Sequence, residues 1–401
     1  MRTPPPPSHN IGVRPPLIFT GLDHFLGSSG APWKNKRLGL IAHGASVTRT
    51  LKHAVDVLPK AGFNIAALFA PEHGLSADQQ DQAPIDSDRD RHTHRPIFSL
   101  YGKTLSPTPA MLEKIDALLF DLQDIGIRYY TFIWTMALAM KACAQAGKPF
   151  IVLDRPNPLG GVIVEGNMPD PAFASFVGLY PLPVQHGMTT GELALYFDRT
   201  QKWGTDLHVI PMSGWRRDMR FNDTGLPWVL PSPNMPTLDT ATVYGGMCLL
   251  EATNLSEGRG TTRPFEIVGA PYVDGAKLAK ALHDQNLPGV QFRPLHFRPT
   301  FHKWAGQLCG GVQLHVTDPD PFKSFRTGLT FIQTVRRLFP KFRWKPPPYE
   351  YETKKKPMDI LCGTDRVRRW IEAQKNIVAL EKSWREDRRN FAQERRKNLL
   401  Y

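Results

Sequence analysis

Three apolar runs in this chain end directly in clusters of polar residues, and this layout constrains the fold more than any other feature does. The runs cover residues 65–70, 117–120 and 150–153, and the polar clusters that follow them are Pro71-Glu72-His73-Gly74, Asp121-Leu122-Gln123-Asp124 and Asp154-Arg155-Pro156-Asn157. Buried parallel strands read as continuous apolar runs, and open α/β sheets bind ligands just beyond the carboxyl ends of their strands. The sequence therefore predicts one cleft at which three strand ends converge.

Further strands and helices alternate with these runs along the first half of the chain. Two more strands are expected at 37–41 and 207–210, and helices are expected at 48–61, 108–115, 131–146 and 191–199. This alternation has the spacing of βαβ units, which form parallel sheets covered by helices on both faces. We therefore predict a doubly wound, mainly parallel α/β sheet.

The length of 401 residues predicts two domains, by a rule of roughly 150 residues each. The second half follows a Gly-rich stretch and reads as helices at 275–284 and 322–339, strands near 290–293 and 312–316, and terminal helices. We predict a catalytic domain over 20–265 and a smaller, auxiliary α+β domain over 266–401. The Pro-rich residues 1–19 are expected to form a disordered tail.

The composition favours a soluble, cytoplasmic protein with no membrane partner. The N-terminal segment has no apolar core of signal-peptide length, and the most apolar expected helix is interrupted by Lys141 well short of a membrane span. The four cysteines lie far apart, without metal or redox spacing, so we expect them to be reduced and packed.

The positive charge is concentrated near the C-terminus. The net charge is +13, and residues 341–401 hold 17 Lys or Arg against 9 Asp or Glu. Such an end could contact nucleic acid or an anionic polymer. Residues 381–388, however, mix both signs with apolar residues at helical spacing, which is typical of a solvated helix. We favour the solvated helix and expect no nucleic-acid partner.

The carboxylates at the strand ends point to acid–base chemistry. Glu72 follows a strand and precedes a glycine that allows close backbone approach, and apolar surroundings would favour its protonated form, as a general acid requires. Hydrolysis of a glycosidic bond needs a second carboxylate, for which Asp124 and Asp121 are candidates. A helix cap or an ion pair with Arg128 is an equally open role for either aspartate.

Other polar stretches have the composition of a sugar site. The turn Asp154–Pro158 is rigid and offers the planar fork of Arg155, although an internal Asp154–Arg155 scaffold is the alternative. The stretches 232–236 and 254–262 combine amides, carboxylates, guanidinium and hydroxyls, which suit sugar hydroxyl and acetamido groups. No Lys of a P-loop and no G-x-G-x-x-G fingerprint is present, so we expect no cofactor.

The long polar loop at 76–95 carries acidic and His residues at alternating positions, as a calcium loop does at its start. It lacks the glycine at the sixth position and the closing glutamate of such a loop. We therefore expect no metal, and interpret the loop as a lid beside the active edge.

Taken together, the motifs resemble those of the NamZ-type exo-β-N-acetylmuramidases, in the same order along residues 20–401. The motifs that carry the resemblance are Pro71-Glu72-His73-Gly74, Phe120–Gly126 with Arg128-Tyr129-Tyr130, Asp154–Gly161, His186–Thr189, Pro231–Pro236 and 254–262. A departure is the segment Ala42–Ser46, where many relatives have an Asn-containing turn.

The resemblance implies a Rossmann-like N-terminal domain, an auxiliary C-terminal domain and an active cleft between them. The implied activity is exo-hydrolysis that releases N-acetylmuramic acid from the non-reducing end of peptidoglycan fragments, so the expected partner is a saccharide or muropeptide. The catalytic glutamate of the family corresponds to Glu72, and we assign the second group to Asp124, with Asp121 in reserve. The alternative is a non-catalytic sugar-binding or muropeptide-binding protein with the same cleft.

The predicted substrate-binding residues come from six separate stretches of the chain. They are His73, Gln123, Arg128, Tyr129, Tyr130, Asp154, Arg155, Asn157, His186, Asn234, Asn254, Glu257 and Arg259. Beyond the family pattern, we infer that Arg128 and Arg259 pair with the lactyl carboxylate, because an arginine fork binds a carboxylate in bidentate fashion. The oligomeric state and the stereochemistry are left open.

Overall fold

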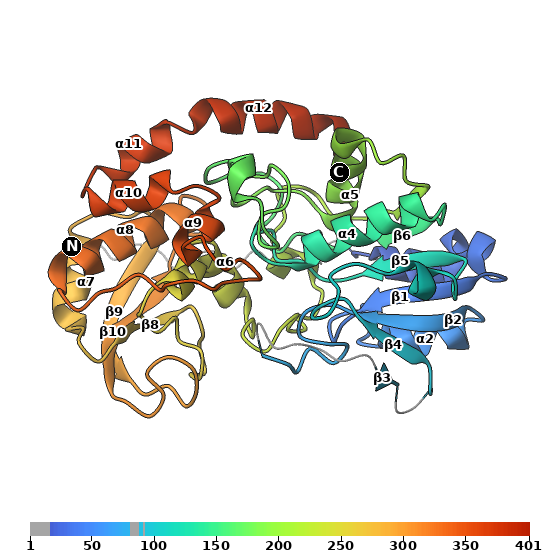
Figure 1. The fold of residues 1–401 in the computed structure, drawn as a ribbon, viewed down its shortest axis with the longest axis horizontal. Helices are drawn as coiled ribbons and strands as arrows, with labels where there is room; N and C mark the ends of the chain where they lie inside the picture. The colour runs from blue at the N-terminus through green and yellow to red at the C-terminus, as the bar shows by residue number, and fades with distance from the viewer. Residues whose placement is uncertain (1–16, 81–87, 91–92) are drawn as a thin grey trace, which may run out of the picture.

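The computed structural model describes residues 17–80, 88–90 and 93–401, and these form two halves (Figure 1). One half is built on a seven-stranded sheet and the other on a three-stranded sheet. Ile18 is already buried and Phe19 pairs with Ser213, so the packed chain starts slightly before the predicted domain start at residue 20. The rest of the expected N-terminal tail lies outside the described residues.

The large sheet has the strand order of a Rossmann fold. Its strands are β1 (Arg37–Ala42), β2 (Asn64–Ala70), β3 (Asp88–Arg89), β4 (Pro96–Ser99), β5 (Ala117–Asp121), β6 (Phe150–Leu153) and β7 (Leu207–Ile210). The order is β3-β4-β2-β1-β5-β6-β7, and only the edge strand β3 is antiparallel. The six parallel strands, numbered along the chain, therefore run 3-2-1-4-5-6 across the sheet. The predicted doubly wound α/β domain is confirmed.

Both faces of this sheet are buried, which explains the continuous apolar runs. Leu118 and Phe120 of β5 belong to the core on one face, together with α4 (Phe132–Gln145) and α5 (Thr190–Gln201). Their neighbours Ala117 and Leu119 belong to a second core on the other face, with α2 (Ala54–Lys60). Alternate residues of one strand thus enter different cores, so no position is left for polar side chains.

Two expected helices of the first half are shorter in the structure. The helix expected at 48–61 is α2, which begins at Ala54 because the His53 side chain accepts a hydrogen bond from the Val55 N–H at 3.2 Å and caps the helix. Leu51, with φ of 60°, cannot belong to a regular helix. The helix expected at 108–115 is α3 (Pro109–Leu112), and a short α1 (Gly21–His24) was not expected.

The second half is a smaller domain with an antiparallel sheet. Strands β8 (Ile267–Ala270), β9 (Val290–Phe297) and β10 (Cys309–Val316) pair in the order β8-β10-β9. The helices of this half are α6 (Leu238–Met247), α7 (Gly275–His283), α8 (Ser324–Leu338), α9 (Pro357–Cys362), α10 (Arg366–Glu372), α11 (Ile377–Lys382) and α12 (Arg385–Arg395). Helix α6 packs on α8, although it precedes the boundary predicted near residue 265.

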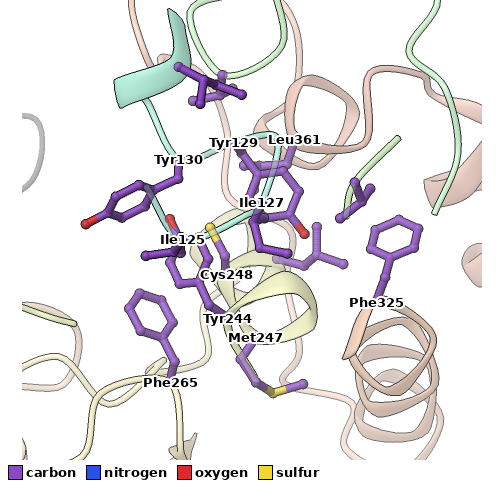
Figure 2. Close-up of a cluster of buried hydrophobic side chains, with 14 of the residues drawn as sticks. Ile125, Ile127, Tyr129, Tyr130, Tyr244, Met247, Cys248, Phe265, Phe325 and Leu361 are labelled. Atoms are coloured by element: carbon purple, nitrogen blue, oxygen red, sulfur yellow. The ribbon is translucent and has the colours of Figure 1, made fainter. Parts of the chain in front are cut away.

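The loop that follows β5 joins the two halves. Figure 2 shows Ile125, Ile127, Tyr129 and Tyr130 of this loop beside Tyr244, Met247 and Cys248 of the α6 region. The rings of Tyr129 and Tyr130 lie 6.0 and 5.8 Å from that of Tyr244. These residues belong to one core that extends from the large sheet into the second half. Relative movement of the halves would break this core apart.

The C-terminal helices cross back over the molecule. Helix α12 spans the top of Figure 1 from the second half toward α5, and Arg395 at its end donates to the carbonyls of His186 and Gly187 at 2.8 and 2.7 Å. Tyr401 then reaches the first half, where its hydroxyl donates to Asp154 at 2.7 Å. The basic end therefore packs against the protein through part of its length.

The described part of the chain contains no helix that is both long enough and apolar enough to cross a membrane. All four cysteines are buried and unbridged, as expected.

Candidate active site

A pocket lies where the end of β2 meets the loop after β5 and two segments of the second half. Its lining combines carboxylates, hydroxyls, a guanidinium and aromatic rings, which is the mixture of polar and apolar groups found at small-molecule sites. Six predicted site residues line it: Glu72, His73, Tyr129, Tyr130, Asn234 and Arg259. The structure thus brings together side chains from stretches that lie up to about 190 residues apart in sequence.

Glu72 lies just beyond the carboxyl end of β2 and is only 4% exposed. The Thr131 hydroxyl, at the start of α4, donates to Glu72 Oε2 at 2.7 Å. His73 and Gly74 adopt left-handed backbone angles, with φ of 70° and 81°, and turn the chain sharply after the strand. His73 Nδ1 bonds the Gln79 carbonyl at 2.8 Å, which fixes the turn. The carboxyl group is therefore held in one orientation at the pocket wall.

A second carboxylate in this pocket, Glu350, was not predicted from the sequence. It is 9% exposed and accepts a hydrogen bond from the Tyr101 hydroxyl at 3.2 Å. Tyr101 is also hydrogen-bonded to Glu72. The sequence Pro346–Glu352 places carboxylates and aromatic rings on a proline-stiffened turn, and this signal could have identified Glu350.

Arg259 is positioned in the pocket by two buried carboxylates. Its guanidinium lies 2.8 Å from Glu251 and 3.4 Å from Glu257, and it stacks 5.1 Å from the centre of the Phe265 ring. Burial alone would raise the pKa of Glu257, but the cations Lys303, His302 and Arg259 outweigh it and hold that pKa well below its ordinary value. Glu257 is therefore an ionised support for Arg259, rather than a residue of the pocket lining.

Asp124, the predicted second catalytic group, lies near this pocket but does not line it. Its Oδ2 accepts from the Gly126 N–H at 2.6 Å and lies 3.8 Å from His186 Nε2. Within the described part of the chain, Asp124 Oδ1 has no hydrogen-bond partner. Burial raises the pKa of Asp124 to about 7, against the lowering effect of the Gly126 and Ile125 N–H groups. Burial and then Arg395 lower the pKa of His186 to about 3.

Asp121, the reserve candidate, forms a buried scaffold in the structure. Arg155 donates to its two oxygens at 2.6 and 2.9 Å, and the Asp121 side chain is fully buried. Arg155 also donates to the Val47 carbonyl at 3.1 Å. With both carboxylate oxygens taken by one guanidinium, Asp121 has the ion-pair role, and the partner is Arg155 instead of Arg128.

Asp154 also serves as an internal support. It accepts hydrogen bonds from Thr189, Thr190 and the Gly191 N–H at 2.8, 3.0 and 2.7 Å, which ties the end of β6 to the start of α5. The Tyr401 hydroxyl is a further donor. These bonds fix the geometry of the sheet edge behind the pocket.

The position of Arg128 does not fit our inference that it pairs with the lactyl carboxylate. Its guanidinium is 0% exposed and donates to four carbonyls at 2.7–3.0 Å. Two belong to Asn167 and Leu182 of the first half, and two to Leu361 and Cys362 of the second. The four carbonyls occupy the fork, so the structure gives Arg128 the task of joining the two halves.

The remaining predicted binding residues also hold loops in place. The Gln123 amide donates to the Asp124 and Pro156 carbonyls at 2.7 and 2.9 Å, and the Asn157 amide donates to the Met188 carbonyl at 2.9 Å. Asn254 lies in the second half, where it bonds the Lys341 and Arg343 backbone. None of these three side chains lines the Glu72 pocket.

Among the residues described, no cluster of three or more His, Cys, Asp or Glu could hold a metal ion. The alternating acidic and His positions of the 76–95 loop fall partly outside the described residues, as do residues 81–87 and 91–92 of the expected lid.

Two family models match consecutive parts of the chain. The N-terminal part of the exo-β-N-acetylmuramidase NamZ matches residues 38–239, and the C-terminal part matches residues 242–401. The division between them falls at the start of α6, upstream of the boundary that we predict near residue 265. The N-terminal and C-terminal family models therefore match the chain in the expected order.

Comparison with characterised and solved proteins agrees with this match. The peptidoglycan β-N-acetylmuramidase NamZ of Bacillus subtilis (strain 168) is 45% identical over 397 residues, which are 99% of this chain and 94% of that protein. A DUF1343 family protein from Bacteroides fragilis NCTC 9343 superposes with a TM-score of 0.87 at 35% identity, covering 97% of this chain and 100% of that one. A second such protein from the same organism gives 0.75 at 29% identity, covering 96% and 99%. The chain belongs to the exo-β-N-acetylmuramidase NamZ family.

Proposed function

We propose that this protein releases N-acetylmuramic acid from the non-reducing end of peptidoglycan fragments, with Glu72 as the general acid. The observation that carries the proposal is the buried Glu72 carboxyl at the wall of a polar and aromatic pocket, in a chain of the NamZ family. A glycosidase must protonate the leaving oxygen, and a carboxyl group shielded from water is suited to keep and deliver that proton.

The pocket also offers recognition groups for an acidic amino sugar. Arg259 supplies a guanidinium, and Tyr130 and Tyr244 present aromatic rings. An arginine fork binds a carboxylate through two parallel hydrogen bonds, and the lactyl group distinguishes N-acetylmuramic acid from N-acetylglucosamine by such a carboxylate. We therefore propose Arg259, without Arg128, as the lactyl-binding residue.

Substitution Glu72→Gln tests the acid role, because it keeps the shape and removes the proton. We expect kcat on a β-linked N-acetylmuramic acid to N-acetylglucosamine disaccharide to fall by about 10²–10⁴-fold. An aryl glycoside with an activated leaving group needs little protonation and should be hydrolysed nearly normally. Unchanged turnover of the disaccharide would exclude Glu72 as the acid, and sugar binding by the wild-type protein without any hydrolysis would favour the non-catalytic alternative.

The remaining expectations concern partners and compartment. We propose that the protein has no nucleic-acid partner, which is supported by the burial of Phe391 and Arg395 in its basic C-terminal end. A cytoplasmic location remains a prediction that cell fractionation can check.

A further inference from the structure

We propose that Glu350 is the general base that works opposite Glu72, and that hydrolysis therefore inverts the anomeric centre. This inference rests on the proposed function, because it names the second catalytic group of the same site. It assigns that role to a residue of the second half, about 280 residues away from Glu72 in sequence.

Glu350 sits on a turn whose backbone few side chains tolerate. Tyr349 and Glu352 exchange backbone hydrogen bonds in both directions at 2.9 Å, and the two residues between them have φ of 46° and 64°. Two left-handed residues in such a turn are ordinarily Asn, Asp or Gly. Here the positions hold Glu350 and Tyr351, so the turn carries a conformational cost. Such strain is typical of positions where the side chain has a function.

The turn is fastened to the site by its neighbours. The Tyr349 hydroxyl donates to Glu251 Oε2 at 2.6 Å, and Glu251 in turn holds Arg259. Tyr351 lies edge-on to Tyr101 at 5.5 Å between ring centres. Glu350 therefore faces the Glu72 pocket with its backbone fixed on both sides.

The Tyr101 hydroxyl links the two carboxyl groups. Burial, and then the carboxylates of Glu72 and Glu350, raise the pKa of Tyr101 far above its ordinary value, so the hydroxyl stays protonated. It donates to Glu350 at 3.2 Å and is also hydrogen-bonded to Glu72. One hydroxyl group thus joins Glu72 and Glu350 in a single hydrogen-bonded network at the pocket.

An inverting glycosidase uses two carboxyl groups, one as the acid and the other as the base that activates a water. Like charges placed close together favour a state with one shared proton, which separates the acid from the base. With Glu72 as the proposed acid, Glu350 is proposed as the base. The first product anomer tests this role, because a second carboxylate that acted as a nucleophile would retain the configuration.

The proposed step is a single displacement at C1. Glu72 transfers its proton to the glycosidic oxygen while the C1–O bond breaks, and the electron pair of that bond stays on the leaving oxygen. A water molecule forms the new bond to C1 from the opposite face, and Glu350 accepts one of its protons. The first product is the α anomer of N-acetylmuramic acid, and Glu72 is left ionised until the proton returns from Glu350 through solvent.

Glu350 fits the second role better than Asp124 does. Glu350 lines the same pocket as Glu72 and shares a hydroxyl with it, whereas Asp124 lies outside that lining. Asp124 also has a strong bond to the Gly126 N–H, which would restrain its movement toward a water.

The test compares four variants on two substrates, the disaccharide and an aryl β-glycoside of N-acetylmuramic acid. We expect Glu350→Gln to lose at least about 100-fold in kcat on both substrates, because the attack on C1 needs a base whatever the leaving group. Glu72→Gln should lose activity on the disaccharide alone. Glu352→Gln neutralises a carboxylate of the same turn, which caps the Lys354 N–H, and should behave as wild type. Asp124→Asn should keep at least a third of the wild-type kcat.

Azide and the first product anomer complete the test. In Glu350→Ala, azide should restore turnover of the aryl substrate and give the α-glycosyl azide, because azide attacks C1 without a base. NMR of the wild-type reaction should show the α anomer first, and this measurement needs no variant.

Retention in the wild type, or near-normal turnover of a folded Glu350→Gln protein, would overturn the inference. In either case the proposed function would stand as long as the wild type releases N-acetylmuramic acid and Glu72→Gln fails on the disaccharide. A wild-type protein that releases no sugar would overturn both.

Discussion

Two stretches of this protein, the loop 125–130 and the stretch 251–259, each carry an arginine that we inferred from the sequence to bind the same ligand carboxylate. Arg128 of the first is enclosed by four backbone carbonyls from both halves of the molecule. Arg259 of the second stands at the pocket wall, held by the carboxylates of Glu251 and Glu257. The contrast indicates that the partners of an arginine decide its role. Carbonyls from several segments give the arginine a structural role in joining those segments, whereas carboxylates that hold it from behind orient the guanidinium toward a ligand.

Arg128→Met should be the most damaging substitution in these two stretches. Up to four buried carbonyls lose their donor, at about 1–3 kcal/mol for each unsatisfied group, so we expect the free energy of unfolding to fall by about 3 kcal/mol or more. Urea denaturation followed by fluorescence measures this loss. The control is Arg37→Met, which removes an exposed pair with Asp116 and should change stability far less. Equal stability of the two variants would show that Arg128 does not stabilise the contact between the two halves.

Asp124→Asn probes the structural role of the first stretch through pH. The folded pKa of about 7 exceeds the ordinary value of 3.8, so the neutral carboxyl stabilises the fold at low pH and this contribution is lost as the pH rises toward 7. The non-titrating variant should therefore gain stability over the wild type between pH 4 and pH 7, by on the order of 2–4 kcal/mol, and the difference should level off above pH 8. Thermal melts across this range measure it.

Asp116→Asn provides the matched control, because Arg37 lowers the pKa of Asp116 to about 2. Here the stabilising contribution is present above the ordinary pKa and is lost as the pH falls, so the variant should be the less stable protein at neutral pH. A stability difference for Asp124→Asn that does not change between pH 4 and pH 8 would contradict burial as the cause of its raised pKa.

Arg259→Lys should be the mildest of these changes, and it concerns recognition in the second stretch. Lysine keeps the charge but loses the planar fork. We expect KM for the N-acetylmuramic acid substrate to rise about 10-fold, which corresponds to about 1.4 kcal/mol. The same aryl glycoside of N-acetylglucosamine, which lacks the lactyl group, should be affected little. An equal loss on both substrates would mean that Arg259 supports the pocket without reading the lactyl group.

The sequence predicts the sheet and one wall of the site, because both depend on local patterns. Continuous apolar runs indicate strands buried on two faces, and Glu72 follows such a run directly. The sequence does not show which side chains at the strand ends face the pocket. The strand-end motifs also contain Asp121, Asp154 and Arg155, but these side chains bond one another or neighbouring segments. Whether a strand-end side chain faces the pocket depends on how distant loops pack against it.

Contributions from the second half were harder to predict. Tyr101 and Glu350 meet across about 250 residues of chain, and neither belongs to a motif that we recognised in the sequence. Their meeting depends on how the loop 125–130 seats one half on the other, which is a tertiary property. The turn at 349–352 nevertheless has a distinctive sequence, because Tyr and Glu alternate there directly after three prolines.

The core shared by loop 125–130 and α6 has a consequence for how this protein should fail under stress. Both halves of the molecule contribute to the pocket lining, so a small displacement of one half relative to the other would misalign the reacting groups while each sheet stays intact. Mild heating should therefore abolish enzyme activity at temperatures where circular dichroism still shows native secondary structure.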